Sequence, residues 1–194
     1  MTILLVRHGE TEWNRARRYQ GWSDSPLTAR GIVQAEAIGH RLRALPEAAG
    51  AAIVASPIGR ARHTAEIIAG VLERTAPPRF DERLREISLG SWDGLGRKEI
   101  RALMGAAFAE FEWYFQTPDG ESYDTFAGRI AAWLRELGDG PVIAVCHGVV
   151  TRVLRGLYAG LPRGEALCLP VPQDRIFRLA GGSIEEIAVP ALDR

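Results

Sequence analysis

Residues 3–9, with the sequence ILLVRHG, join an uninterrupted apolar run to an arginine, a histidine and a glycine. An apolar run of this length, from Ile3 to Val6, is typical of a strand buried on both faces of a sheet. The run stops at Arg7 and His8, whose side chains both bind phosphate groups. We therefore expect a buried strand that presents these two side chains at its carboxyl end.

Two further segments show the same pattern, in which an apolar run ends on polar groups. Residues 51–55 end at Ser56-Pro57, and Arg60 lies in the first turn of the helix predicted next. Residues 141–146, PVIAVC, end at His147, and another helical pattern follows. Strands that alternate with helices predict an α/β fold, here a three-layer α/β/α sandwich with a mostly parallel sheet and helices on both faces.

The carboxyl ends of parallel strands lie at one edge of a sheet, and ligands bind at that edge. Arg7, His8, Arg60 and His147 are therefore expected to converge there and to form the active site. Helices that begin near residues 58 and 148 would direct backbone N–H groups and positive dipole ends to the same place. Two arginines, two histidines and two helix starts predict a site for a dianion, with phosphate as the leading candidate.

Histidine at a strand end adds a nucleophile that can carry a phosphoryl group. His8 must attack as a neutral imidazole, with its other ring nitrogen held by a hydrogen bond, for which we expect a backbone carbonyl. The leaving alkoxide then needs a proton from a carboxylic acid. The segment ERLREISLGSWDG offers Glu82, Glu86 and Asp93. Glu86 lies between apolar neighbours, so we expect it to be desolvated, with a raised pKa that keeps it protonated.

The length of 194 residues suits one domain, which we place over residues 1–194. Residues 92–121 are interpreted as an insertion or lid, because the stretch from Gly96 to Glu121 shows no clear strand, many aromatic residues and a turn at 118–120. The tail, from about residue 166, indicates two or three short strands. Phe108, Phe111 and Phe115 share one face if residues 108–115 are helical, and they belong either to the core or to a wall for an uncharged organic group.

Charge and cysteine content exclude several classes of function. Lys+Arg and Asp+Glu both number 24, so no net field attracts nucleic acid or a membrane. Cys146 and Cys168 lie far apart and in no metal-ligand spacing, which is typical of reduced thiols in a cytosolic protein. We therefore expect a cytoplasmic protein that has no metal site and no nucleic-acid or membrane partner.

Four segments, LLVRHGETEWN, SPIGRARHTA, LREISLGSWDG and VCHGVVTR, resemble the histidine phosphatase (phosphoglycerate mutase-like) superfamily in order and approximate spacing. With GWSDSPLTARG, the resemblance spans nearly the whole chain. It implies a phosphohistidine intermediate on His8 and an acid, then base, role for Glu86. The expected catalytic residues are His8, Glu86, His147, Arg7 and Arg60. The expected substrate-binding residues are Asn14, Gln20, Gly21, Trp22 and Gly148.

Family resemblance leaves the reaction open between a phosphatase and a mutase. Mutases of the family carry a longer, more basic insertion between the acid and the second histidine, whereas TPDGESY resembles the smaller phosphatases. We therefore predict a hydrolase of phosphomonoesters, acting on a small phosphorylated metabolite without a cofactor, as a monomer or homodimer. The alternative is a phosphoglycerate mutase that needs 2,3-bisphosphoglycerate. Residues 15, 17 and 18, all arginines, are either a solvated loop or a source of positive potential at the cleft mouth.

Two rival interpretations use the same segments differently. Cys146 and Arg152 satisfy the Cys-x5-Arg spacing of cysteine-dependent phosphatases, in which a thiolate attacks phosphate from a strand-to-helix loop. That interpretation leaves Arg7 and His8 without a role, so Cys146 is better read as the last buried residue of its strand. A phosphate-binding module without activity is the other rival, and the intact acid and histidine pair argue against it.

Overall fold

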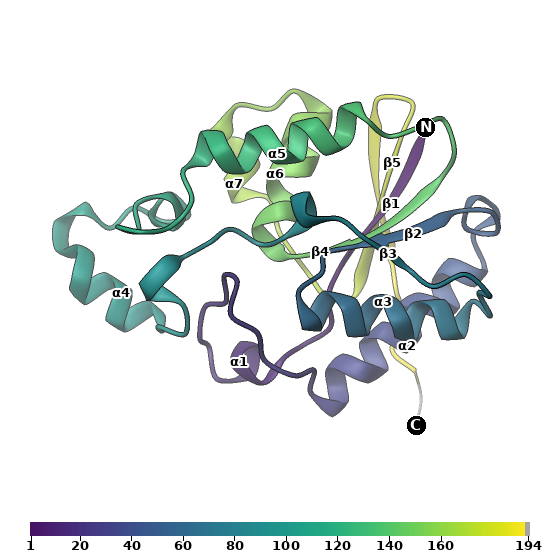
Figure 1. Cartoon of the computed structure of the whole chain (residues 1–194), viewed down its shortest axis with the longest axis horizontal. Helices are drawn as coiled ribbons and strands as arrows, with labels where there is room; N and C mark the ends of the chain where they lie inside the picture. Colours follow the sequence, from purple (N-terminus) through teal and green to yellow (C-terminus); the bar gives the residue numbers. More distant parts are fainter. Residues whose placement is uncertain (193–194) are drawn as a thin grey trace.

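The computed structural model describes residues 1–192, in which a six-stranded sheet lies between two layers of helices (Figure 1). The strands are β1 (Thr2–Arg7), β2 (Ala52–Ala55), β3 (Arg79–Phe80), β4 (Val142–Cys146), β5 (Arg175–Ala180) and β6 (Ser183–Ala188). Their order is β3-β2-β4-β1-β5-β6. Neighbouring strands from β3 to β1 pair in parallel, and β5 and β6 add an antiparallel hairpin. The predicted α/β/α sandwich with a mostly parallel sheet is confirmed.

Some of the helices begin at a residue whose side chain caps the first turn. Thr28 is an N-cap and accepts a hydrogen bond from the backbone N–H of Gly31. No helix within residues 1–192 is both long and apolar enough to cross a membrane.

The helices are α1 (Glu12–Arg15), α2 (Ala29–Arg43), α3 (Gly59–Val71), α4 (Arg97–Met104), α5 (Tyr123–Arg135), α6 (Gly148–Ala159) and α7 (Arg163–Cys168).

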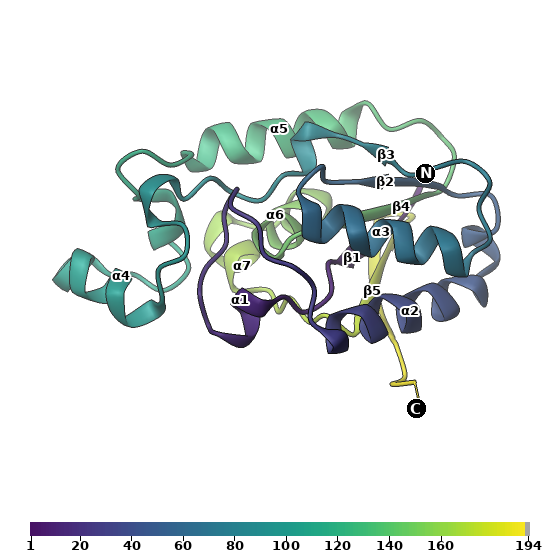
Figure 2. The ribbon, with the colours of Figure 1, turned by 60° about the horizontal axis from the view of Figure 1, so that its bottom comes forward.

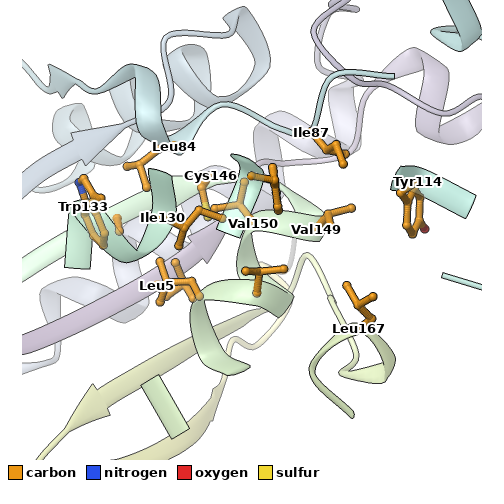
Figure 3. Close-up of a cluster of buried hydrophobic side chains, with 14 of the residues drawn as sticks. Leu5, Leu84, Ile87, Tyr114, Ile130, Trp133, Cys146, Val149, Val150 and Leu167 are labelled. Carbon is orange, nitrogen blue, oxygen red and sulfur yellow. The ribbon is translucent and has the colours of Figure 1, made fainter. Parts of the chain in front are cut away.

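Alternate side chains of β1 enter two separate hydrophobic cores, as the two-residue period of a strand requires. Leu5 points into the cluster that contains Trp133 of α5 and Val150 of α6 (Figure 3). Leu4 joins Ile38 of α2 in the cluster on the other face. Figures 1 and 2 show the corresponding layers, with α2 and α3 on one side of the sheet and α5 and α6 on the other. Burial on both faces therefore fixes where β1 ends.

Residues 92–121 differ from the expected aromatic helix. Only α4 and short 3-10 turns form there, so Phe108, Phe111 and Phe115 do not share one helical face. Trp113 is fully buried and Tyr114 nearly so, which agrees with the core interpretation of the aromatic stretch. Figure 1 shows α4 at one end of the molecule, away from the sheet. Whether these residues act as a lid stays a prediction.

The tail differs from the expected pattern at its beginning. Residues 163–168 form α7, so the tail contains two strands, which begin only at Arg175. Leu167 of α7 is buried in the same core as Val150 of α6 (Figure 3), which explains why an apolar segment there is helical. The loop between α7 and β5 reaches the carboxyl end of β1, where Arg7 donates to the carbonyl oxygen of Val171.

Two glycines let the chain after β1 pass directly over the first turn of α2. A Cβ on Gly9 would lie 2.3 Å from the carbonyl oxygen of Gly31, and a Cβ on Gly31 would lie 2.1 Å from the carbonyl oxygen of Glu10. The backbones therefore pack without intervening side chains. This close approach holds the residue that follows His8.

We expect Gly31→Ala to lower the free energy of unfolding by about 1–3 kcal/mol, because the new methyl group must displace backbone. Gly70→Ala is the matched control, since Gly70 also lies in a helix but nothing lies within 4 Å of its Cβ position. It should raise stability by up to about 1 kcal/mol through helix propensity. Urea unfolding measures both variants, and equal stability of the two would contradict the close-packing interpretation.

Candidate active site

The carboxyl ends of β1 and β4 bring two histidines together. The strands pair in parallel with Arg7 opposite Cys146, so His8 and His147 follow at neighbouring positions. Their ring centroids lie 5.3 Å apart, and both side chains are buried. The predicted convergence of the two histidines is therefore seen in the structure.

His8 has the hydrogen bonding that a nucleophilic imidazole requires. Its Nδ1 lies 2.8 Å from the carbonyl oxygen of Gly9. Because a carbonyl only accepts, Nδ1 carries the proton and Nε2 keeps its lone pair. Burial, followed by the charges of Arg60 and Arg7, lowers the pKa of His8 well below its ordinary value. The ring is thus neutral, and the expected backbone carbonyl partner is present.

His147 is held by the carboxyl end of a third strand, β2. Its Nε2 lies 2.7 Å from the hydroxyl oxygen of Ser56, while its Nδ1 is buried without a hydrogen-bond partner within residues 1–192. Burial lowers the pKa of His147 well below its ordinary value, with smaller contributions from Arg60 and His8. A buried polar nitrogen without a partner favours a ligand that supplies one.

Two arginines lie near the imidazole pair, of which Arg60 is buried and Arg7 is partly buried. Arg7 donates to the carbonyl oxygen of Val171 at 2.6 Å, and Arg60 donates to that of Ser23 at 2.8 Å. The Nε atoms of both arginines have no hydrogen-bond partner among the described residues. Burial lowers the pKa of each guanidinium, although both remain cations because arginine titrates so high. Buried cations with spare donors favour an oxyanion such as phosphate.

Glu86 is the acid that the structure places beside this group. Its side chain is buried, and its oxygens accept from the backbone N–H groups of Val149 at 3.1 Å and Val150 at 3.3 Å. Burial raises the pKa of Glu86, and it outweighs the hydrogen bond from Val149 and the attraction of Arg60. The raised pKa favours the protonated acid that was expected from its apolar neighbours.

Glu82 and Asp93, the other two candidate acids, form contacts away from His8. Glu82 is mostly exposed and pairs with Arg85. Asp93 accepts from the backbone N–H groups of Gly21 and Ser23, both at 2.7 Å, and so holds the loop after residue 20. Neither lines the cavity next to His8.

A cavity of about 500 Å³ opens beside His8, Arg7 and Glu86. Asn14, Gln20 and Gly148, all expected to contact substrate, also line it. The sequence placed residues 17 and 18 at the cleft mouth in one of two alternatives and Arg152 only within the cysteine interpretation, and it did not assign the others to the site. These additional lining residues are Arg17, Arg18, Tyr19, Arg97, Tyr114, Arg152 and Gln173.

Gly21 and Trp22 do not line this cavity, in contrast to the prediction that they bind substrate. Gly21 accepts from Arg60 through its carbonyl oxygen at 2.9 Å. Trp22 is half-exposed and donates from Nε1 to the carbonyl oxygen of Glu86 at 2.9 Å. Both residues therefore contact catalytic candidates through hydrogen bonds, Gly21 with Arg60 and Trp22 with Glu86.

Known proteins match this chain over almost its full length. The family model described as "Histidine phosphatase superfamily (branch 1)" matches residues 3–182. This chain belongs to the histidine phosphatase superfamily.

Similar proteins carry different functional names. A "Probable phosphoglycerate mutase GpmB" of Citrobacter koseri is 39% identical, with 100% of this chain and 98% of that protein covered. The structure "Bacillus stearothermophilus YhfR" is 35% identical, covers 99% of this chain and 98% of that one, and gives a TM-score of 0.81. A mycobacterial glucosyl-3-phosphoglycerate phosphatase in complex with VO3 is 29% identical, covers 96% of each chain, and gives a TM-score of 0.79.

The structure contradicts the interpretation of this histidine phosphatase superfamily member as a cysteine-dependent phosphatase. Both the position of Cys146 and the protonation of its thiol exclude it as the nucleophile. Cys146 is fully buried and does not line the cavity. Burial raises the pKa of its thiol to about 12, so a thiolate does not form near neutral pH. Arg152 lines the cavity without a thiolate partner.

A side chain from the loop before β5 also contributes to the candidate site. The amide Nε2 of Gln173 donates to the carbonyl oxygen of His8 and to Oδ1 of Asn14, both at 3.1 Å. The backbone N–H of Thr11 also donates to this Oδ1, at 3.3 Å. Because Oδ1 of Asn14 is occupied by two donors, its amide N–H groups are left to face other partners. Gln173 and the backbone N–H of Thr11 thus set the orientation of Asn14 together.

We expect Gln173→Met to weaken binding of inorganic phosphate about tenfold, because Asn14 loses one of the two donors that orient it. Isothermal titration calorimetry measures the affinity, with the exposed Gln116→Met as control. The same change should have little further effect in an Asn14→Leu background. Additive losses in the double variant would show that Gln173 does not act through Asn14.

Proposed function

We propose that this histidine phosphatase superfamily member hydrolyses phosphomonoesters of small metabolites through a phosphohistidine on His8. The observation that carries the proposal is a neutral His8 with a free Nε2 in the same cavity as a buried Glu86 whose pKa is raised. A nucleophile and an acid with these protonation states are what transfer from an ester requires. We further propose a cytoplasmic location and no cofactor.

In the first step, Nε2 of His8 forms a bond to phosphorus as the bond to the ester oxygen breaks. Glu86 gives its proton to the leaving oxygen. In the second step, the Glu86 carboxylate takes a proton from water, whose oxygen attacks phosphorus and releases His8. Arg7 and Arg60 stabilise the charge on the transferring oxygens, and His147 donates to them when protonated.

Phosphoglycerate mutase activity is the second candidate, and the name of the 39% identical relative favours it. A mutase must keep water away from the phosphohistidine and would need 2,3-bisphosphoglycerate. The cavity of about 500 Å³ lies within the range of pockets for drug-sized ligands. A three-carbon substrate would leave room in it for water, which supports hydrolysis.

We expect His8→Ala to abolish hydrolysis of p-nitrophenyl phosphate, by at least about 10³-fold, because the nucleophile is lost. Cys146→Ser should keep the activity. A phosphodonor should label the wild type with acid-labile, base-stable phosphate, and His8→Ala should not be labelled. Full activity of His8→Ala would overturn the proposal. With 3-phosphoglycerate, release of free phosphate is expected, whereas accumulation of the 2-isomer would identify a mutase.

Glu86→Gln should reduce hydrolysis of phenyl phosphate far more than that of p-nitrophenyl phosphate, because only the poorer leaving group depends on a proton donor. Wild-type kcat/KM should fall as pH rises through the raised pKa of Glu86, which deprotonates the acid. It should also fall as pH drops through the lowered pKa of His8, which protonates the nucleophile. Equal losses on both esters would exclude Glu86 as the acid.

A further inference from the structure

The proposed acid lies in a segment without regular backbone pairing. Glu86 follows a short 3-10 turn, and no helix or strand includes residues 85–89. His8 and His147, in contrast, each follow a buried strand of the sheet. Because residues 85–89 are largely buried, their carbonyl groups need donors from other parts of the chain. These donors decide how firmly the acid is held.

Arg129 of α5 binds this segment through its carbonyl oxygens. Its Nη1 donates to the carbonyl oxygens of Arg83 at 2.6 Å and Arg85 at 2.7 Å, and its Nη2 donates to that of Glu86 at 3.0 Å. The carbonyl oxygen of Glu86 also accepts from Nε1 of Trp22 at 2.9 Å. Two parts of the chain that are far apart in sequence therefore hold the backbone of the acid.

Glu121 fixes the guanidinium of Arg129. Its carboxylate accepts from Nε of Arg129 at 2.8 Å and from Nη2 at 2.9 Å. A guanidinium has five N–H groups, and these two contacts together with the three carbonyl oxygens use all of them. The side chains of Arg129 and Glu121 are only 17% and 9% exposed. A paired guanidinium that uses every donor has one orientation, which a lysine does not reproduce.

Residues 117–123, TPDGESY, lie along the segment that carries the acid. The backbone N–H of Glu121 donates to the carbonyl oxygen of Ser88 at 3.0 Å, and the N–H of Ser88 donates to Oε2 of Glu121 at 3.4 Å. A Cβ on Gly120 would lie 2.6 Å from the same carbonyl oxygen, so glycine permits this approach. The motif that resembles the smaller phosphatases therefore supplies the carboxylate that orients Arg129.

The carboxyl group of Glu86 depends on the position of this backbone. Its oxygens accept from the N–H groups of Val149 and Val150 in the first turn of α6, and Oε1 also accepts from the N–H of Ile87 at 3.1 Å. A shift of the segment by about 1 Å would lengthen these bonds and displace the acid from the leaving oxygen, and displacements of that size cost about 10²-fold in rate.

We propose that Arg129 and Glu121 are positioning residues for Glu86, whose ion pair holds the acid where it protonates the leaving oxygen. Neither side chain is among those of residues 1–192 that line the cavity. Both residues therefore act through the backbone of Glu86 and not on the substrate. This proposal rests on the phosphatase function proposed above.

The dependence of the rate on the leaving group separates positioning from general support of the fold. Arg129→Met should lower kcat/KM about tenfold to a hundredfold for phenyl phosphate but less than about threefold for p-nitrophenyl phosphate, because only the poorer leaving group needs the proton. Arg135→Met is the matched control, since Arg135 is an exposed arginine in the last turn of the same helix. It should keep the wild-type kcat/KM on both esters.

A paired variant removes the ion pair without leaving a buried charge. Arg129→Met combined with Glu121→Met replaces both charges by apolar side chains, a change that proteins often tolerate. The selective loss on phenyl phosphate should persist, because nothing donates to the three carbonyl oxygens. Recovery of the wild-type rate would show that Arg129 only neutralises Glu121, and it would exclude positioning. The paired variant also decides the matter if Arg129→Met does not fold.

Combination with Glu86→Gln completes the test. In that background Arg129→Met should cause no further loss on phenyl phosphate, since the acid that it positions is gone. Equal losses on both esters in Arg129→Met, or additive losses in the double variant, would overturn the positioning role. Neither result affects the phosphatase proposal, which fails instead if His8→Ala stays active or if no phosphohistidine forms. Failure of Glu86 as the acid shows separately, as equal losses on both esters in Glu86→Gln alone.

Discussion

The parallel pairing of β1 with β4 runs in register from Ile3 opposite Val142 to Arg7 opposite Cys146, and the active site follows from it. Both strands are buried on both faces, so a slip of one residue would turn every apolar side chain toward the wrong core. The same register sets His8 and His147 at adjacent positions beyond the sheet. Hydrophobic packing of the two strands therefore positions the imidazoles more rigidly than a loop would.

Burial at this edge also decides the protonation of the catalytic candidates. It lowers the pKa values of both histidines and raises that of Glu86, which favours neutral imidazoles and a protonated acid at this site. The arginines remain charged, which leaves the site positive. A bound phosphate ester would supply the missing negative charge, and it would favour protonation of His147 without removing the lone pair of His8.

Different parts of the fold build the proposed phosphoryl site and the rest of the cavity, which we propose would meet the organic group. The ends of three strands build the first part, through His8, His147 and Ser56. Loops and residues 92–121 build much of the second, where Arg17 and Tyr114 lie. Because loops tolerate change more readily than buried strands, one chemistry can serve different substrates in proteins of this fold.

Local patterns in the sequence were sufficient for β1, β2 and β4 and for the convergence of Arg7, His8, Arg60 and His147, because uninterrupted apolar runs end where buried strands must end. Apolar neighbours also singled out Glu86 among three acids. Tertiary structure alone decided the 3-10 turns of the aromatic stretch, the contact of Gln173 with Asn14, and the arginines of the cavity wall. Those features depend on hydrogen bonds and packing between residues far apart in the chain, which no local periodicity encodes.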